Sequence, residues 1–236
     1  MKKSASKAVL IVNVLIIAAI LSLNYVYQRT GFAFTLKCVC SGGFAVLGML
    51  NLCYALMNKR SNKSFSLLMA MGLILAFIGD IRIDRNFIFG AGAFAAGHIC
   101  FVVAYCFLQR PRLSDLIPSG ILFLGSSAFL QFCPLLFFGL PIYRTVCIVY
   151  SLIISLMLGK AIGNLIRQRN KLNVTLAVAS ILFFFSDLML VFNWFIGLWS
   201  WTGNACMGTY YPALCLLAFT IWQSVHEVQC SRENIM

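Results

Sequence analysis

The chain has 236 residues, of which 61% are hydrophobic and only 10% are charged. A soluble domain could not cover so much apolar surface with so few charges, so the composition excludes a water-soluble enzyme and requires a lipid bilayer as the solvent. The formal net charge of +12 would suit nucleic-acid binding, but the basic residues stand in short clusters between apolar runs, which excludes a folded basic face.

Polar breaks divide the chain into eight apolar runs, and a membrane-spanning helix needs roughly 20 apolar residues. In chain order, the predicted transmembrane helices cover residues 8–27, 33–57, 65–83, 88–108, 117–138, 143–165, 172–193 and 204–226. Because the connections are short, residues 1–236 are predicted to form one all-α transmembrane domain. The breaks after the third and fifth runs are the weakest, so six or seven helices are the alternative.

The basic residues predict the orientation, because Lys and Arg are retained on the cytoplasmic side of a membrane. With the amino terminus inside, the cytoplasmic segments carry Lys2, Lys3, Lys7, Lys59, Arg60, Lys63, Arg110, Arg112, Arg167, Arg169, Lys171 and Arg232. The opposite segments carry only Arg29, Lys37, Arg82, Arg85 and Arg144, and Lys160 lies within the sixth helix. Both termini are therefore predicted to be cytoplasmic. The chain is therefore predicted to be an integral, multi-pass membrane protein, which would lie in the cell membrane if its source is bacterial.

Ionisable residues inside predicted helices are candidates for function because burying them in lipid is costly. Asp80 and Asp187 each lie about fifteen residues, or roughly 22 Å, into helices that run outward, and His98 lies roughly 15 Å into a helix that runs inward. This shared depth predicts one polar cavity that opens outward, with Lys37 near its rim. The alternative is that these groups pair only to hold helices together. Asp84, near the boundary and flanked by arginines, is interpreted as a solvated loop charge.

Two blocks of residues resemble a known family in their order and spacing. The first block is Gly79-Asp80, Phe87, Gly90, Ala93-Phe94 and His98; the second is Leu182-Phe183, Ser186-Asp187, Asn193 and Thr209-Tyr210-Tyr211. Together they resemble the lysoplasmalogenase-like (YhhN-like) membrane proteins, whose members include enzymes that cleave the vinyl ether bond of lysoplasmalogens. Weaker matches are Lys37, Tyr150, Met157 and Ala161, and departures from the family pattern are Arg82, Phe101 and Pro212.

The resemblance implies a membrane hydrolase that converts an alkenyl glycerophosphoethanolamine or glycerophosphocholine into a fatty aldehyde and a glycerophospho-base. A vinyl ether is opened by acid, so the reaction needs an acid and an anion. Asp80 and Asp187 are the predicted catalytic pair, because two carboxylates in unlike environments can supply both groups. The sequence leaves open which of them is the acid. His98 is the third predicted catalytic residue, as a positioner of water or as part of a proton relay.

The predicted substrate is a lysophospholipid drawn from the bilayer, and its ether bond would lie just below the headgroup. The predicted substrate-binding residues are Lys37, Arg144, Tyr150, Asn193, Tyr210 and Tyr211, of which Lys37 and Arg144 would hold the phosphate. No metal or other cofactor is required by this chemistry. The rival interpretation is a proton-coupled transporter of small solutes that uses Asp80, Asp187 and His98, although the chain offers no paired repeat.

Overall fold

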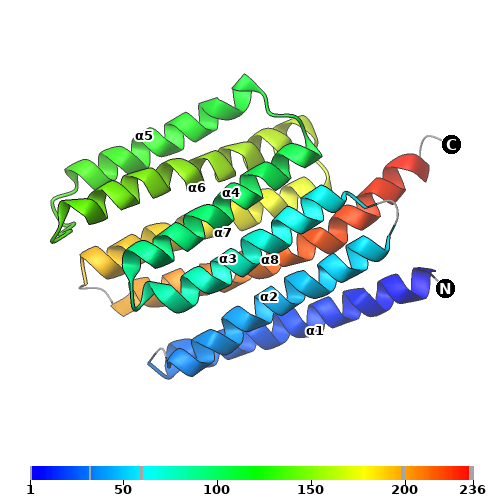
Figure 1. Cartoon of the computed structure of the whole chain (residues 1–236), viewed down its shortest axis with the longest axis horizontal. Helices are drawn as coiled ribbons and strands as arrows, with labels where there is room; N and C mark the ends of the chain where they lie inside the picture. Colours follow the sequence, from blue (N-terminus) through cyan, green and yellow to red (C-terminus); the bar gives the residue numbers. More distant parts are fainter. Residues whose placement is uncertain (1, 32, 59–60, 198–199, 234–236) are drawn as a thin grey trace.

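In the computed structural model, the described residues are 2–31, 33–58, 61–197 and 200–233, and eight long helices account for most of them (Figure 1). The helices are α1 (Lys2–Arg29), α2 (Phe34–Met57), α3 (Lys63–Ile83), α4 (Phe87–Leu108), α5 (Leu116–Phe132), α6 (Pro141–Arg167), α7 (Lys171–Phe195) and α8 (Ser200–Glu233). All eight are long and apolar enough to cross a membrane. The prediction of an all-α bundle with eight spanning helices is confirmed.

Both termini lie at the same end of the bundle (Figure 1), which we call the terminal end. The other end, where α1 meets α2 and α3 meets α4, is called the opposite end. Which of them faces the cytoplasm stays a prediction from the basic residues. Two of those residues, Lys59 and Arg60, lie outside the described part of the chain.

Asparagine side chains begin three of the helices, and a proline ends one early. Asn62, Asn86 and Asn170 each accept a hydrogen bond from the backbone N–H three residues further on, which satisfies a donor that the first helical turn leaves free. Helix α5 ends at Phe132 rather than at residue 138 as predicted. The cause is Pro134, because the residue before a proline avoids helical backbone angles, and Cys133 is extended.

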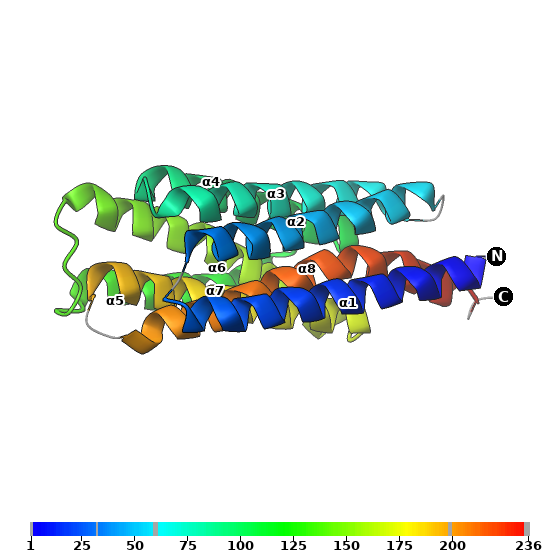
Figure 2. The same ribbon diagram turned by 90° about the horizontal axis from the view of Figure 1, so that it is seen from below.

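Six helices form a closed ring, and two pack outside it. Around the ring the neighbours are α2, α3, α4, α6, α7 and α8, and α8 returns to α2. Helix α1 packs outside against α2 and α8, while α5 packs outside mainly against α6, so the two outer helices lie at opposite edges (Figure 1). In the view turned by 90°, α2, α3 and α4 lie on one side of the bundle and α1, α7 and α8 on the other (Figure 2).

The closest helix pair in the ring is α3 with α4, and glycines make this approach possible. A Cβ atom on Gly90 would lie 2.5 Å from the Ile83 Cα, and one on Gly97 would lie 3.0 Å from the Gly72 carbonyl oxygen. Any side chain at Gly90 would therefore push the two backbones apart. This tight packing holds α3 and α4 at a fixed depth relative to each other, and the intramembrane Asp80 and His98 lie on these two helices.

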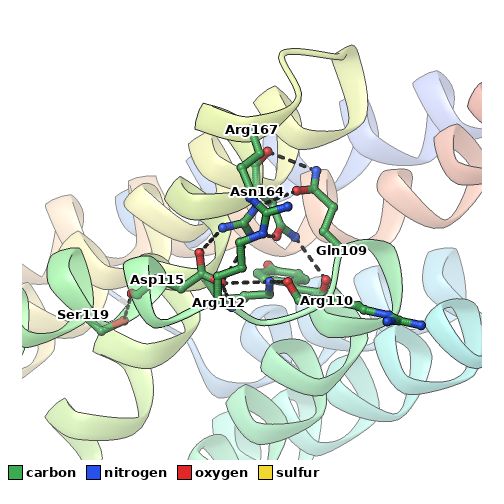
Figure 3. Close-up of polar contacts among 9 residues, drawn as sticks. Gln109, Arg110, Arg112, Asp115, Ser119, Asn164 and Arg167 are labelled. Atoms are coloured by element: carbon green, nitrogen blue, oxygen red, sulfur yellow. Dashed lines mark hydrogen bonds and ion pairs between the residues drawn. The ribbon is translucent and has the colours of Figure 1, made fainter.

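A charged network at the terminal end joins α5 to α6 (Figure 3). Asp115 lies in η1 (Leu113–Asp115), a short 3-10 helix before α5, and its carboxylate is paired with the Arg167 guanidinium and with the Lys160 ammonium at 3.1 Å. Gly163 makes room for it, since a Cβ there would lie 2.1 Å from Asp115 Oδ1. The intramembrane Lys160 is thus neutralised by an acidic residue that the sequence did not single out.

Replacing Asp115 is expected to destabilise the protein much more than replacing Lys160. Asp115→Asn leaves the buried Lys160 and the largely buried Arg167 without a counter-ion, which should lower the free energy of unfolding by about 3 kcal/mol. Lys160→Met leaves Asp115 paired with Arg167, so the loss should stay below about 1 kcal/mol. Thermal unfolding of the purified proteins in one detergent measures both, and equal losses would contradict this account.

Candidate functional site

A polar cavity of about 440 Å³ lies inside the ring, in the half toward the opposite end. Side chains from six helices, α1, α2, α3, α4, α7 and α8, line it. They include Tyr27, Lys37, Asp80, Asp84, Phe94, Asp187, Asn193, Trp194 and Tyr210. The two intramembrane aspartates therefore face one cavity, as their matching depths in the sequence predict. Its volume falls within the range of sites that bind small molecules, roughly 300–1,000 Å³.

The first cluster in the cavity wall is built around Asp80. The carboxylate is buried and lies 3.3 Å from the Lys37 ammonium. The Ser41 hydroxyl also hydrogen-bonds to it, and the Tyr211 hydroxyl lies 3.3 Å from Asp80 Oδ2. A carboxylate that is surrounded by a cation and two hydroxyl donors matches its partners when it is ionised. The Lys37 ammonium is the contact that most favours an ionised Asp80.

Lys37 lies in the first turn of α2 and is buried. Its ammonium donates to Asp84 Oδ2 at 2.7 Å in addition to its contact with Asp80. The Asp84 side chain is 50% exposed, as expected for a solvated charge at the end of a helix, but it is also a partner of Lys37. Two carboxylates and one ammonium leave this cluster with one net negative charge. Lys37 therefore belongs to the electrostatics of Asp80 and is not a free cation that waits for a phosphate.

The second cluster is a chain of three polar side chains from α7, α6 and α4. The Tyr150 hydroxyl donates to Asp187 Oδ2 at 2.7 Å and lies 2.7 Å from His98 Nε2. The other ring nitrogen of His98 lies 3.1 Å from the Met157 sulfur, and His98 is 1% exposed. Tyr150 therefore links a buried imidazole to a carboxylate at the cavity wall. This arrangement is a path along which a proton can move between His98 and Asp187.

The structure separates the three predicted catalytic residues into two groups. Asp80 and Asp187 line the cavity, whereas His98 lies behind Tyr150 and does not line it. His98 is 3.5 Å from Asp187 Oδ2, so it acts on the cavity through Tyr150 and Asp187. The expectation that His98 would itself face the cavity is therefore wrong. The physical reason is that His98 is buried and packs against Tyr150 of α6 and Phe183 of α7.

Tyr210 lines the cavity and has a buried hydroxyl. Its ring is held by edge contacts with Phe44, Phe94 and Phe183, at centroid distances of 6.1, 6.0 and 5.5 Å. The residue is 3% exposed, and among the described residues its hydroxyl has no hydrogen-bond partner. A buried hydroxyl without a partner is costly, and a rigid one is ready to bind a ligand oxygen. Tyr210 therefore stays a candidate for binding a ligand oxygen.

Of the remaining predicted binding residues, some lie at the cavity and one does not. Tyr211 contacts Asp80 from the neighbouring position of α8, and Asn193 lines the cavity. Arg144 does not line the cavity, because its guanidinium lies over the Phe138 ring at 5.2 Å. The structure therefore does not bring Arg144 and Lys37 together as a phosphate clamp.

Sequence reasoning missed Ser41, which hydrogen-bonds to Asp80. Ser41 follows Lys37 by four residues, so the two share one face of α2 and could have been paired by helical spacing alone. In the described part of the chain, no group of three or more His, Cys, Asp or Glu side chains is placed to hold a metal ion.

An eight-helix bundle with ionisable groups around an internal cavity defines a polytopic membrane protein with an intramembrane polar site. Its family follows from the sequence comparison: the model of the YhhN family matches residues 41–221, and the chain belongs to this family. The predicted resemblance is confirmed. The matched region includes Asp80, His98, Asp187 and Tyr210, whereas Tyr27 and Lys37 precede it. No curated protein and no solved structure matches the chain.

Removing the Lys37 charge is expected to destabilise the protein. Lys37→Met leaves Asp80 buried without its cation, and breaking a buried pair in this way costs about 3 kcal/mol. Asp84→Asn is the matched control, because the Asp84 side chain is 50% exposed and the Lys37–Asp80 pair remains; its loss should be below about 1 kcal/mol. Thermal unfolding in detergent compares them. A Lys37→Met protein as stable as wild type would refute the ion-pair account.

Proposed function

We propose that this protein is a membrane-embedded hydrolase that cleaves the vinyl ether bond of single-chain alkenyl phospholipids (lysoplasmalogens) to a fatty aldehyde and a glycerophospho-base. The observation that carries the proposal is the pair of carboxylates, Asp80 and Asp187, in unlike surroundings on one cavity. Asp80 is surrounded by a cation and hydroxyl donors, whereas Asp187 is connected to a tyrosine and a histidine. Membership of the YhhN family is consistent with this chemistry.

Asp187 is the proposed acid. Tyr150 engages Oδ2, which leaves Oδ1 to carry the proton into the cavity. The reaction begins when this proton moves to the β-carbon of the vinyl ether, which turns the double bond and the ether oxygen into an oxocarbenium ion. The Asp187 carboxylate then takes a proton from the water that adds to the cationic carbon, and this step regenerates the acid. His98 and Tyr150 supply a second route for that proton.

Asp80 is the proposed anion that stabilises the oxocarbenium ion. Its cluster keeps one net negative charge after Lys37 is counted against Asp80 and Asp84. A fixed negative charge in the cavity wall stabilises a developing cation, because it is already oriented before the reaction begins. The hemiacetal that water addition produces then collapses: the Asp187 acid protonates the glycerol oxygen, the bond from that oxygen to the hemiacetal carbon breaks, and the hemiacetal hydroxyl returns its proton to Asp187 as the carbonyl of the aldehyde forms. Lys37, Ser41 and Tyr211 hold Asp80 in place for this role.

The direct test measures aldehyde release from an alkenyl lysophospholipid in D₂O. Protonation at carbon predicts one deuterium on the carbon next to the aldehyde group, which mass spectrometry detects. Asp187→Asn should lower kcat by about 10² to 10⁴, the range for a lost general acid. Asp80→Asn should lower it by about 10² to 10³, the range for lost electrostatic stabilisation.

Three outcomes of this test are informative. Aldehyde without deuterium, or undiminished release by both aspartate variants, would refute the mechanism. No aldehyde from the wild-type protein on any alkenyl lipid would refute the substrate. An acyl lysophospholipid serves as the control substrate, because its ester has no vinyl ether carbon to protonate. Thermal unfolding shows that the inactive variants are folded.

Tyr210→Phe is expected to lower kcat/KM by about tenfold, which corresponds to the loss of one hydrogen bond to the substrate. The matched control is Tyr105→Phe, because Tyr105 is also fully buried but its hydroxyl lies 3.1 Å from Ser180, outside the cavity lining. This control should leave kcat/KM unchanged. If both substitutions lower the activity equally, Tyr210 has only a packing role.

A further inference from the structure

An apolar groove adjoins the polar cavity on the side of α5 and α6. Its walls come from α3, α4, α5, α6 and α7. Four residues, Ile83, Phe94, Asp187 and Leu190, line both spaces. The proposed acid therefore stands where an apolar space and a polar space meet.

The groove leads from the inside of the ring to the outer helix α5. Phe94 lies at its inner part, in the aromatic cluster around Tyr210. Ser126, Phe129 and Leu130 of α5 line its outer part. Apart from Asp187, Tyr150 and two serines, the lining residues are apolar. Both serine hydroxyls bond to backbone carbonyls of their own helices, so they offer little polarity to the groove.

Helix α5 forms the outer wall of the groove and is fastened at its two ends. At the terminal end, the Asp115 network ties it to α6 (Figure 3). At the opposite end, the chain that follows α5 is tied to α7 by a hydrogen bond from the Phe137 N–H to the Phe195 carbonyl, 3.0 Å long. Between these ends α5 exposes apolar side chains such as Ile121 and Leu124, which are 69% and 68% exposed. In a membrane this face meets lipid, so the groove ends beside the bilayer.

We propose that this groove binds the hydrocarbon chain of the substrate, with the polar part of the same molecule in the cavity. A single-chain amphiphile has this division into an apolar and a polar part, and the bond between them would lie at Asp187. The groove is the smaller of the two spaces, with about 70 Å³ against about 440 Å³ in the cavity, which suits a single chain. Burial of each methylene contributes about 0.8 kcal/mol, so the groove selects for chain length. The proposal rests on the proposed function for the identity of the polar part.

The test measures binding of non-cleavable O-alkyl lysophospholipids with C12 and C18 chains to the purified full-length protein. Ser126→Phe places a ring in the outer part of the groove and should weaken C18 binding by about tenfold, the effect of about two lost methylenes, while C12 binding changes little. The matched control is Ala128→Phe, because Ala128 is two residues away on α5, is exposed and does not line the groove. It should leave both affinities unchanged.

A second variant keeps the test decisive if Ser126→Phe does not fold. Ser151→Leu narrows the same groove from α6, and it should produce the same loss for the long chain. Equal behaviour of a folded groove variant and Ala128→Phe would overturn the proposal, as would equal affinity for C12 and C18 chains in the wild-type protein. The probe cannot be cleaved, so the binding result does not depend on whether the protein releases aldehyde. Failure of the groove proposal and failure of the proposed function are thereby distinguished.

Discussion

The cost of placing ionisable groups inside a membrane explains the arrangement of this protein. Charged side chains at such depths persist when they are paired and turned inward. Lys37 is paired with Asp80 and Asp84, and Lys160 is paired with Asp115. The first group lies in the cavity wall and the second joins the chain before α5 to α6. The same constraint therefore supports the candidate site and fastens an outer helix.

The two aspartates of the cavity differ because different helices supply their neighbours. Asp80 on α3 meets Lys37 and Ser41 from α2. Asp187 on α7 accepts a hydrogen bond from Tyr150 of α6, and both lie beside His98 of α4. The proposed division of roles, with Asp80 as the anion and Asp187 as the acid beside the same space, is the one that acid-catalysed opening of a vinyl ether needs. The adjoining apolar groove makes the site suited to an amphiphile.

Much of the fold was predictable because a spanning helix has a simple signature in the sequence. All eight helices were located, and the depth of Asp80 and Asp187 correctly indicated a shared cavity. The predicted end of the fifth helix was wrong because the run of apolar residues continues past Pro134 although the helix does not. The expected position of the Arg144 side chain at the cavity was also wrong, because its guanidinium lies over the Phe138 ring. Depth can be counted along one helix, but the direction of a side chain around the helix depends on its neighbours.

The sequence by itself determined the bilayer as solvent, the eight helices and the small set of ionisable residues that lie inside them. These features follow from composition and from the fixed rise of an α-helix, which are local properties. The tertiary structure decided the partners: Lys37 with two carboxylates, Tyr150 between His98 and Asp187, and Lys160 with Asp115. It also decided the closed ring that leaves α1 and α5 outside. Partners and ring order depend on how helices far apart in the chain pack and rotate against one another, and no local pattern contains that information.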